Sequence, residues 1–393
     1  MTLYLQHGHG KSSRISDALE DKSVNGVIFA ARNERVENLD ACISSLRADW
    51  DLELLFDPQF YICTMVPPND RYLPDEYASF YQPGRTLKDF IGAKKIREYA
   101  TSTIDFQAAR GLDRLISPTV LFKSFSDQWS QIALQLADSS IDYHADLTDA
   151  PALLVSFVFS ETALDSEDEL GRFLDILTTW DVDGFYLIVA REDPGYSQAF
   201  DEARLQRLLY AVHVLGDRND YEVVCGYSDF IGVPLRAAGA SAFTTGWFHS
   251  LRQFHQRAFL KTRSFGRPSL PRYSSGPLLT SILKSELDSI EDAGYLEDVL
   301  SGVELDSELD SPDAWNLRIS ERHHWQTLAA FDERITGRPR TDVAAMIEAI
   351  LNARGLFTTL QSEGVPFSSQ SDGSHLQDWL RAMRSFQSHT GLK

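Results

Sequence analysis

One pattern recurs along the first 260 residues of this 393-residue chain: a short apolar run is followed by a segment with helical periodicity. The apolar runs are continuous instead of alternating, which is typical of parallel strands that are covered on both faces. We predict strands at residues 3–6, 26–31, 53–56, 119–123, 152–160, 184–190, 221–226 and 242–245. Eight strand–helix units over this length indicate an α/β fold, a closed (β/α)₈ barrel of the TIM type. An open doubly wound sheet is the alternative.

The sequence changes character after residue 260. A stretch with several Pro, Ser and Gly residues indicates a linker at residues 261–276. Helical periodicity then dominates, at residues 277–293, 313–335, 340–361 and 374–388. We therefore predict a barrel over residues 1–260, the linker, and a mostly helical C-terminal domain over residues 277–393.

Charge and cysteine content narrow the classes of function. The net charge of −20 lowers the expectation of nucleic-acid binding, because such a chain is repelled by phosphates at long range. The three cysteines are scattered, which argues against a disulfide framework and against a cysteine-based zinc site. The sequence has no apolar run of about 18 residues and no signal-peptide pattern at its start. We expect a cytoplasmic protein without a membrane partner.

Polar side chains follow every predicted strand, where barrel enzymes place their chemistry. Among them are three carboxylates that we predict to be catalytic: Asp57, Glu161 and Asp229. The residues that we predict to bind a ligand are His7, His9, Asn33, Gln59, Lys123, Arg191, Ser228 and Thr245. Their convergence on one site depends on closure of the barrel.

Two known site patterns are incomplete here. His7-Gly8-His9 and Lys123 resemble the amidohydrolase pattern, but the histidines after the fifth and sixth strands and the aspartate after the eighth are missing. Residues 8–13 (GHGKSS) are similar to a phosphate-binding P-loop, but its first glycine would fall on Leu5. We therefore expect no metal and no other cofactor.

A further similarity concerns residues 226–232 (GYSDFIG) and 238–247 (AGASAFTTGW). Together with residues 183–185 (DGF) and 57–60 (DPQF), they resemble the barrels of tRNA-guanine transglycosylases. The resemblance implies a catalytic role for Asp57. The nucleophilic aspartate of that family would fall near Thr244 or Thr245, and its zinc cluster of three Cys and one His is not matched. Glu161 or Asp229 would have to act as the nucleophile instead.

Two functions follow as hypotheses. The first is a barrel enzyme, of transglycosylase, glycosyltransferase or hydrolase type, that acts on a nucleoside- or sugar-like ligand through carboxylates. Lys123 and Arg191 would hold an anionic part of that ligand. The alternative is a non-catalytic barrel subunit of a multi-protein assembly that associates with nucleic acid.

Charge is segregated at the end of the predicted barrel. Residues 249–273 contain six basic residues and no acidic one: Arg252, Arg257, Lys261, Arg263, Arg267 and Arg272. Residues 286–313 contain eleven acidic residues and no Lys or Arg. Because arginine pairs well with carboxylate and phosphate, the basic residues either dock on the acidic segment or contact a protein partner or nucleic acid. We favour internal docking, since the acidic segment is close in sequence.

Overall fold

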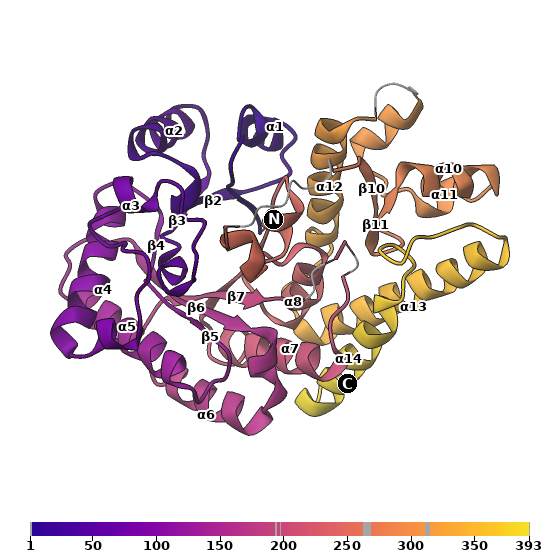
Figure 1. The fold of residues 1–393 in the computed structure, drawn as a ribbon. Helices are drawn as coiled ribbons and strands as arrows, with labels where there is room; N and C mark the ends of the chain where they lie inside the picture. The colour runs from indigo at the N-terminus through magenta and orange to yellow at the C-terminus, as the bar shows by residue number, and fades with distance from the viewer. Residues whose placement is uncertain (1, 193–194, 197, 262–268, 311–314, 393) are drawn as a thin grey trace.

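A computed structural model describes residues 2–192, 195–196, 198–261, 269–310 and 315–392, and its central feature is the predicted parallel barrel (Figure 1). The hydrogen-bonded strand order is β3-β2-β1-β9-β8-β7-β6-β4, and every neighbouring pair is parallel. Between β3 and β4 the backbone amide of Asp113 donates to the carbonyl of Leu54 (2.9 Å), so the barrel is nearly closed. The strands are β1 (Leu3–Gln6), β2 (Gly26–Ala30), β3 (Glu53–Asp57), β4 (Arg114–Ile116), β5 (Leu121–Phe122), β6 (Ala152–Ser160), β7 (Gly184–Ala190), β8 (Glu222–Gly226) and β9 (Ala242–Thr245).

The fourth barrel strand differs from the prediction, which placed a single run at residues 119–123. It consists of two pieces, β4 and β5, and both pair with β6. Between them Pro118 offers no backbone donor, and the Ser117 side chain takes over part of the ladder. Its hydroxyl accepts from the amide of Ser156 (2.9 Å), and its carbonyl accepts from the Ser156 hydroxyl (2.7 Å).

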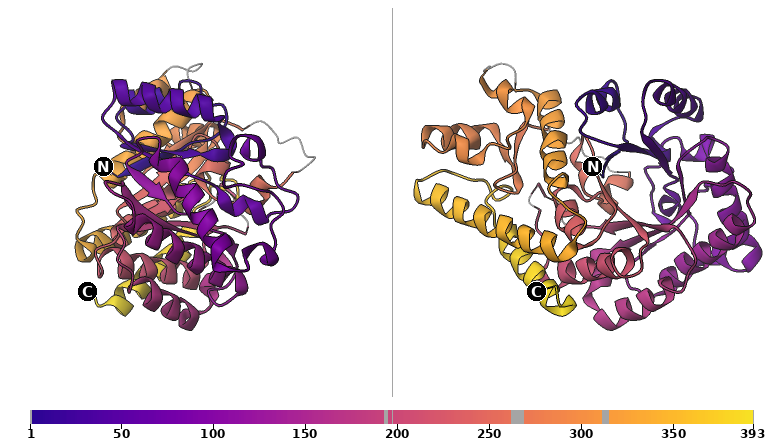
Figure 2. Two further views of the ribbon diagram at one scale, coloured as in Figure 1. Left: turned by 90° about the vertical axis from the view of Figure 1, so that its left-hand side faces the viewer. Right: turned by 180° about the vertical axis from the view of Figure 1, so that it is seen from behind.

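Seven helices of the strand–helix units surround the sheet (Figures 1 and 2). They are α1 (Arg14–Glu20), α2 (Val36–Asp49), α4 (Ala93–Ala108), α5 (Gln128–Ala145), α6 (Glu167–Leu177), α7 (Glu202–Gly216) and α8 (Gly232–Ala238). Side-chain caps explain where several begin: Asp127, Ser166 and Asp201 each accept from a backbone amide of the following first turn. A short helix, α3 (Leu73–Glu76), lies in the insertion after β3.

The eighth helix of the barrel comes from far along the chain. After β9 the strand–helix pattern predicts a helix, at residues 250–260, but the structure has only the short α9 (His249–Arg252) and a 3₁₀ turn at Gln256–Phe259. The place between α1 and α8 is taken by α12 (Leu317–Asp332) (Figure 1). Arg318 of α12 forms an ion pair with Asp17 of α1 (2.5 Å), so this contact fixes α12 against the barrel.

The remaining C-terminal elements are mostly helical. The predicted helix at residues 277–293 begins instead with an antiparallel hairpin of β10 (Arg272–Ser275) and β11 (Thr280–Leu283), whose first strand lies in the predicted linker. The helices are α10 (Lys284–Asp292), α11 (Leu296–Val299), α13 (Pro339–Ser362) and α14 (His375–Thr390). The boundaries that divide the chain into barrel, linker and helical domain stay a prediction.

Helix α13 packs against α8 and α14, and α14 packs against α7. By length and composition alone, α13 is the one helix of the described ranges that could cross a membrane, and 33% of its most apolar window is buried. Core helices of soluble proteins pass the same test.

Candidate functional site

Asp57 lies at the carboxyl end of β3, inside the mouth of the barrel, and is 2% exposed. One carboxylate oxygen accepts from the backbone amide of Gln59 (2.8 Å), and the other accepts from the Tyr61 hydroxyl (2.9 Å). Burial raises the pKa of Asp57 to about 7, although these two hydrogen bonds lower it. The group therefore exchanges a proton near neutral pH, which is the property that a general acid or base needs.

Tyrosine hydroxyls surround this carboxyl group. Tyr61, Tyr186 and Tyr227 are all buried, and burial raises the pKa of each, so all three stay protonated at neutral pH. Tyr186 projects from β7 and donates to the side-chain carbonyl of Gln6 (3.2 Å). Gly226 of β8 makes room for it, since a Cβ there would lie 2.7 Å from the Tyr186 hydroxyl. The barrel interior therefore accommodates polar side chains near Asp57.

Three residues of the mouth have the left-handed backbone conformation that favours glycine. They are Gln59 (φ 50°), Tyr227 (φ 53°) and Asp229 (φ 52°), at the carboxyl ends of β3 and β8. Gln59 is held in place because its side chain accepts from the amide of Arg32 (2.9 Å) and donates to the Tyr227 hydroxyl (3.3 Å). Such strain costs about 1–3 kcal/mol per residue and is concentrated at functional sites.

Residues 253–259, which we call the cover segment, close this mouth. The Phe254 ring contacts Tyr61 and Tyr227, with ring centroids 5.4 Å apart in both pairs. Phe259 stacks on Phe254 (4.7 Å), and the Arg32 guanidinium lies 4.3 Å from the Phe259 ring centroid. Asp57 is therefore enclosed by the cover segment and by the strands below it.

The same region holds buried polar groups without a hydrogen-bond partner. They are Nε2 of Gln6, Nε of Arg32, Oδ1 of Asn33, and both polar atoms of the Gln253 side chain. In addition, Arg32 is 6% exposed and has no carboxylate within 4.0 Å in the described part of the chain, and burial lowers its pKa to about 10. An unsatisfied buried polar group costs about 1–3 kcal/mol, so hydrogen bonds from water or a ligand to these atoms would be favourable.

The other two predicted catalytic carboxylates lie in separate clusters. Glu161 pairs with Arg191 (2.8 Å) and accepts from the amide of Glu192 (2.8 Å), so this buried ion pair ties the loops after β6 and β7 together. Burial lowers the pKa of Arg191. Among the described residues, Asp57, Glu161 and Asp229 share no hydrogen-bond or ion-pair partner. The structure thus does not bring the three carboxylates together.

Asp229 belongs to a hydrogen-bonded chain that the sequence analysis did not include. Its carboxylate lies 2.6 Å from Nε2 of His324 on α12, and Nδ1 of His324 lies 2.7 Å from the Ser274 hydroxyl on β10. Burial lowers the pKa of His324 to about 4. Burial alone would raise the pKa of Asp229, but His324, Arg252 and a hydrogen bond from Thr245 lower it to about 2. At neutral pH an ionised Asp229 therefore accepts from a neutral His324, which accepts from Ser274.

The remaining predicted ligand-binding residues have separate environments. His7 is fully buried, its Nε2 lies 3.5 Å from Glu34, and burial lowers its pKa. His9 is exposed and stacks on Phe248 (4.7 Å). Lys123 is also exposed, whereas the Ser228 hydroxyl donates to the carbonyl of Cys225 (2.8 Å).

The basic residues of the segment 249–273 lie in different environments. Arg252 and Arg272 are buried beside a cavity at the mouth, whereas Arg257 and Lys261 are exposed. Within the described residues none of these four forms an ion pair with the acidic segment, and Lys261 lies 3.9 Å from Asp70 instead. Arg263 and Arg267 lie outside the described residues. Internal docking is therefore not seen for the four that are described.

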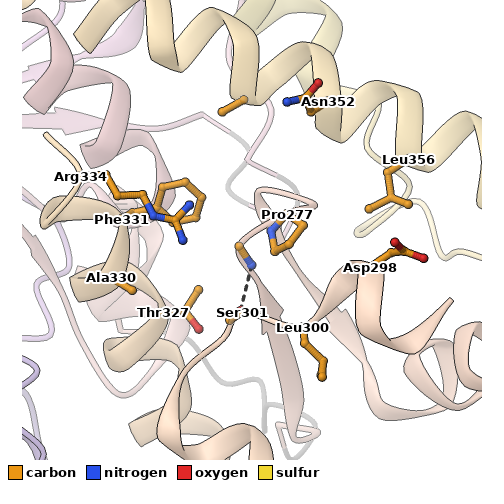
Figure 3. A pocket seen from close by; sticks show the side chains of 12 residues that line it. Pro277, Asp298, Leu300, Ser301, Thr327, Ala330, Phe331, Arg334, Asn352 and Leu356 are labelled. Atoms are coloured by element: carbon orange, nitrogen blue, oxygen red, sulfur yellow. Dashed lines mark hydrogen bonds between the residues drawn. The ribbon is translucent and has the colours of Figure 1, made fainter. Parts of the chain in front are cut away.

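A hollow of about 370 Å³ lies outside the barrel, between α12, α13 and the turn of the β10–β11 hairpin (Figure 3). Thr327, Ser301 and Phe331 line it, and the amide of Gly276 donates to the Ser301 hydroxyl across its floor (2.9 Å). Its charged side chains, Asp298 and Arg334, are exposed. It shows neither the burial nor the unsatisfied groups of the barrel mouth.

No protein-family model and no curated protein matches the chain. Among solved structures, it is similar to nitroalkane oxidase from Streptomyces ansochromogenes, with 12% identity, a TM-score of 0.29, and coverage of 99% of this chain and 96% of that one. It is also similar to dihydrodipicolinate synthase from Oceanobacillus iheyensis, with 13% identity, a TM-score of 0.24, and coverage of 95% and 99%. The resemblance to tRNA-guanine transglycosylases stays a prediction. Among the described residues, no group of three or more His, Cys, Asp or Glu side chains could hold a metal ion.

Proposed function

We propose that the protein is an enzyme that uses Asp57 as a general acid on a nucleoside- or sugar-like ligand in the mouth of the barrel. The observation that supports this most is the combination at one place of a carboxyl group with a pKa of about 7 and several unsatisfied buried polar groups. An uncharged carboxyl group can give its proton to a leaving group, and the amides of Gln6 and Gln253 can bind the polar edge of a planar base or the hydroxyls of a sugar.

The reaction that fits these groups is hydrolysis of a glycosidic bond. Asp57 gives its proton to the leaving group as the glycosidic bond breaks, and water adds to the sugar carbon and returns a proton to Asp57. Since water adds directly to the sugar carbon, this scheme has no covalent intermediate on Glu161 or Asp229. Both carboxylates are held by partners of their own. On the predicted resemblance, the transglycosylase nucleophile would fall near Thr244 or Thr245, and a threonine there favours water over base exchange.

The test is turnover by the purified full-length chain with a panel of nucleosides and nucleotides, in which release of the free base is followed by chromatography. We expect Asp57→Asn to lower the rate at least about a hundredfold, as is common when a general acid is removed. Asp288→Asn is the matched control, because Asp288 lies on α10 in an exposed ion pair with Lys284. Equal rates for wild type and Asp57→Asn would rule out this role for Asp57.

The non-catalytic alternative has one observation in its favour: the cover segment encloses Asp57 in this arrangement. On that hypothesis the barrel is a rigid subunit, and its polar interior serves stability. Absence of both turnover and thermal stabilisation by every compound of the panel would favour this alternative.

A further inference from the structure

A second feature of the barrel mouth is a cavity of about 230 Å³ beside the carboxyl end of β9. Three arginines and one glutamate line it, together with aromatic rings that include Tyr196 and Trp247. The arginines are Arg14 of α1, Arg252 of α9 and Arg272 of β10, and the glutamate is Glu321 of α12. We call this hollow the arginine cavity.

Within the described residues, one of the three arginines forms an ion pair. Arg14 pairs with Glu321 (2.8 Å). Arg252 and Arg272 are 7% and 8% exposed, and neither has a carboxylate within 4.0 Å in the part of the chain that the structure describes. Their hydrogen bonds go to backbone carbonyls: Nε of Arg252 donates to Gly246 (2.9 Å), and Nη1 of Arg272 donates to Ser281 (3.0 Å).

The two guanidinium groups have carboxylates only at longer range, Asp229 for Arg252 and Glu286 for Arg272. Burial lowers the pKa of Arg272, while Tyr196 and Glu286 raise it, so an anion in direct contact would stabilise the buried charge further. A bound anion would supply that direct contact.

The geometry favours phosphate as that anion. The planar guanidinium group pairs with phosphate through two parallel hydrogen bonds, and aromatic contacts hold these groups in place. Arg272 lies 4.1 Å from the Tyr196 ring centroid, and Arg14 lies 5.9 Å from that of Trp247. The position of the cavity also favours phosphate, because many TIM barrels bind phosphate at the loops after their last two strands.

We propose that the arginine cavity binds a phosphate group, and that the ligand of the barrel mouth is therefore a phosphate ester, such as a nucleotide or a sugar phosphate. One segment serves both places, since Trp247, Phe248, His249 and Arg252 line the cavity and residues 253–259 cover Asp57. The inference names the substrate class for the function proposed above and rests on that proposal for the reaction, but not for binding of the anion.

The test is titration calorimetry of the full-length protein with pyrophosphate. We expect wild type to bind pyrophosphate, and we expect Arg252→Met and Arg272→Met to weaken binding at least about tenfold, as for loss of a charge-assisted hydrogen bond. Arg252→Lys, which keeps the charge but not the planar fork, should bind with intermediate affinity. Arg257→Met is the matched control, because Arg257 is an exposed arginine of the same segment outside the cavity. Thermal unfolding without ligand shows which variants are folded.

Three results would overturn the proposal. One is failure of folded wild type to bind pyrophosphate, and another is loss of binding in Arg257→Met equal to that in Arg272→Met. The third is acetate binding as tightly as pyrophosphate, which would indicate a general carboxylate site. Asp57→Asn separates the two proposals, since it should lose turnover yet bind pyrophosphate as wild type does.

Discussion

At the scale of single residues, the carboxyl group of Asp57 makes the free energy of unfolding depend on pH. Its pKa is about 7 in the folded chain against an ordinary value of 3.8, so between these pH values the folded chain keeps a proton that the unfolded chain releases. Its contribution to stability is complete at low pH and is lost as the pH rises through the folded pKa. We predict that Asp57→Asn gains on the order of 4 kcal/mol relative to wild type between about pH 4 and about pH 7.

Urea unfolding of both proteins at a series of pH values measures this difference. Asp288→Asn should follow wild type, because its carboxylate is exposed. If the free energy of unfolding changed with pH in the same way for Asp57→Asn and wild type, Asp57 would titrate as an ordinary carboxyl group.

Sequence patterns could locate Asp57 but not its environment. Asp57 directly follows an apolar strand, so it could be predicted at the barrel mouth. Tyr186, by contrast, lies within an apolar run and is indistinguishable there from a core residue. His324 was missed for another reason: it lies 95 positions from Asp229, on a helix that periodicity alone does not place against the barrel.

At the scale of elements, the cover segment controls access to Asp57. Phe254 is fully buried between the two tyrosines and Phe259. We predict that Phe254→Ala lowers the free energy of unfolding by about 3–5 kcal/mol, the usual cost of this truncation in a core. It should also lower the pKa of Asp57, because water would then reach the carboxyl group and favour its charged form.

Urea unfolding and the pH dependence of stability test both effects. Val66→Ala is the control, since Val66 is 74% exposed. A Phe254→Ala protein as stable as wild type would mean that the segment rests loosely on the barrel.

Element prediction succeeded where the apolar run was long and uninterrupted. The bounds of β6 and β7 agree with the predicted runs residue for residue, since these strands are buried along nearly their whole length. Prediction was inaccurate where a side chain replaced the backbone ladder, as Ser117 does between β4 and β5. The hairpin of β10 and β11 was missed because its strands lie in segments that we interpreted as linker and helix.

At the scale of the whole molecule, α12 connects the C-terminal region to Thr2, near the N-terminus, and to α8. The buried carboxylate of Asp332 accepts from the Thr2 hydroxyl (2.8 Å) and from Nε of Arg236 on α8 (2.9 Å). The C-terminal region thus supplies the eighth helix around the barrel. We infer that the barrel and α12 unfold together.

We therefore predict a single unfolding transition for wild type, seen alike by far-ultraviolet circular dichroism and by tryptophan fluorescence. Asp332→Ala should shift that whole transition, with a loss of about 3–5 kcal/mol, because it leaves the Arg236 charge without its partner. Arg334→Ala, two residues further along and exposed, should leave the transition in place. Two separate transitions, with only the second displaced by Asp332→Ala, would instead show that residues 1–260 fold without the helices that follow them.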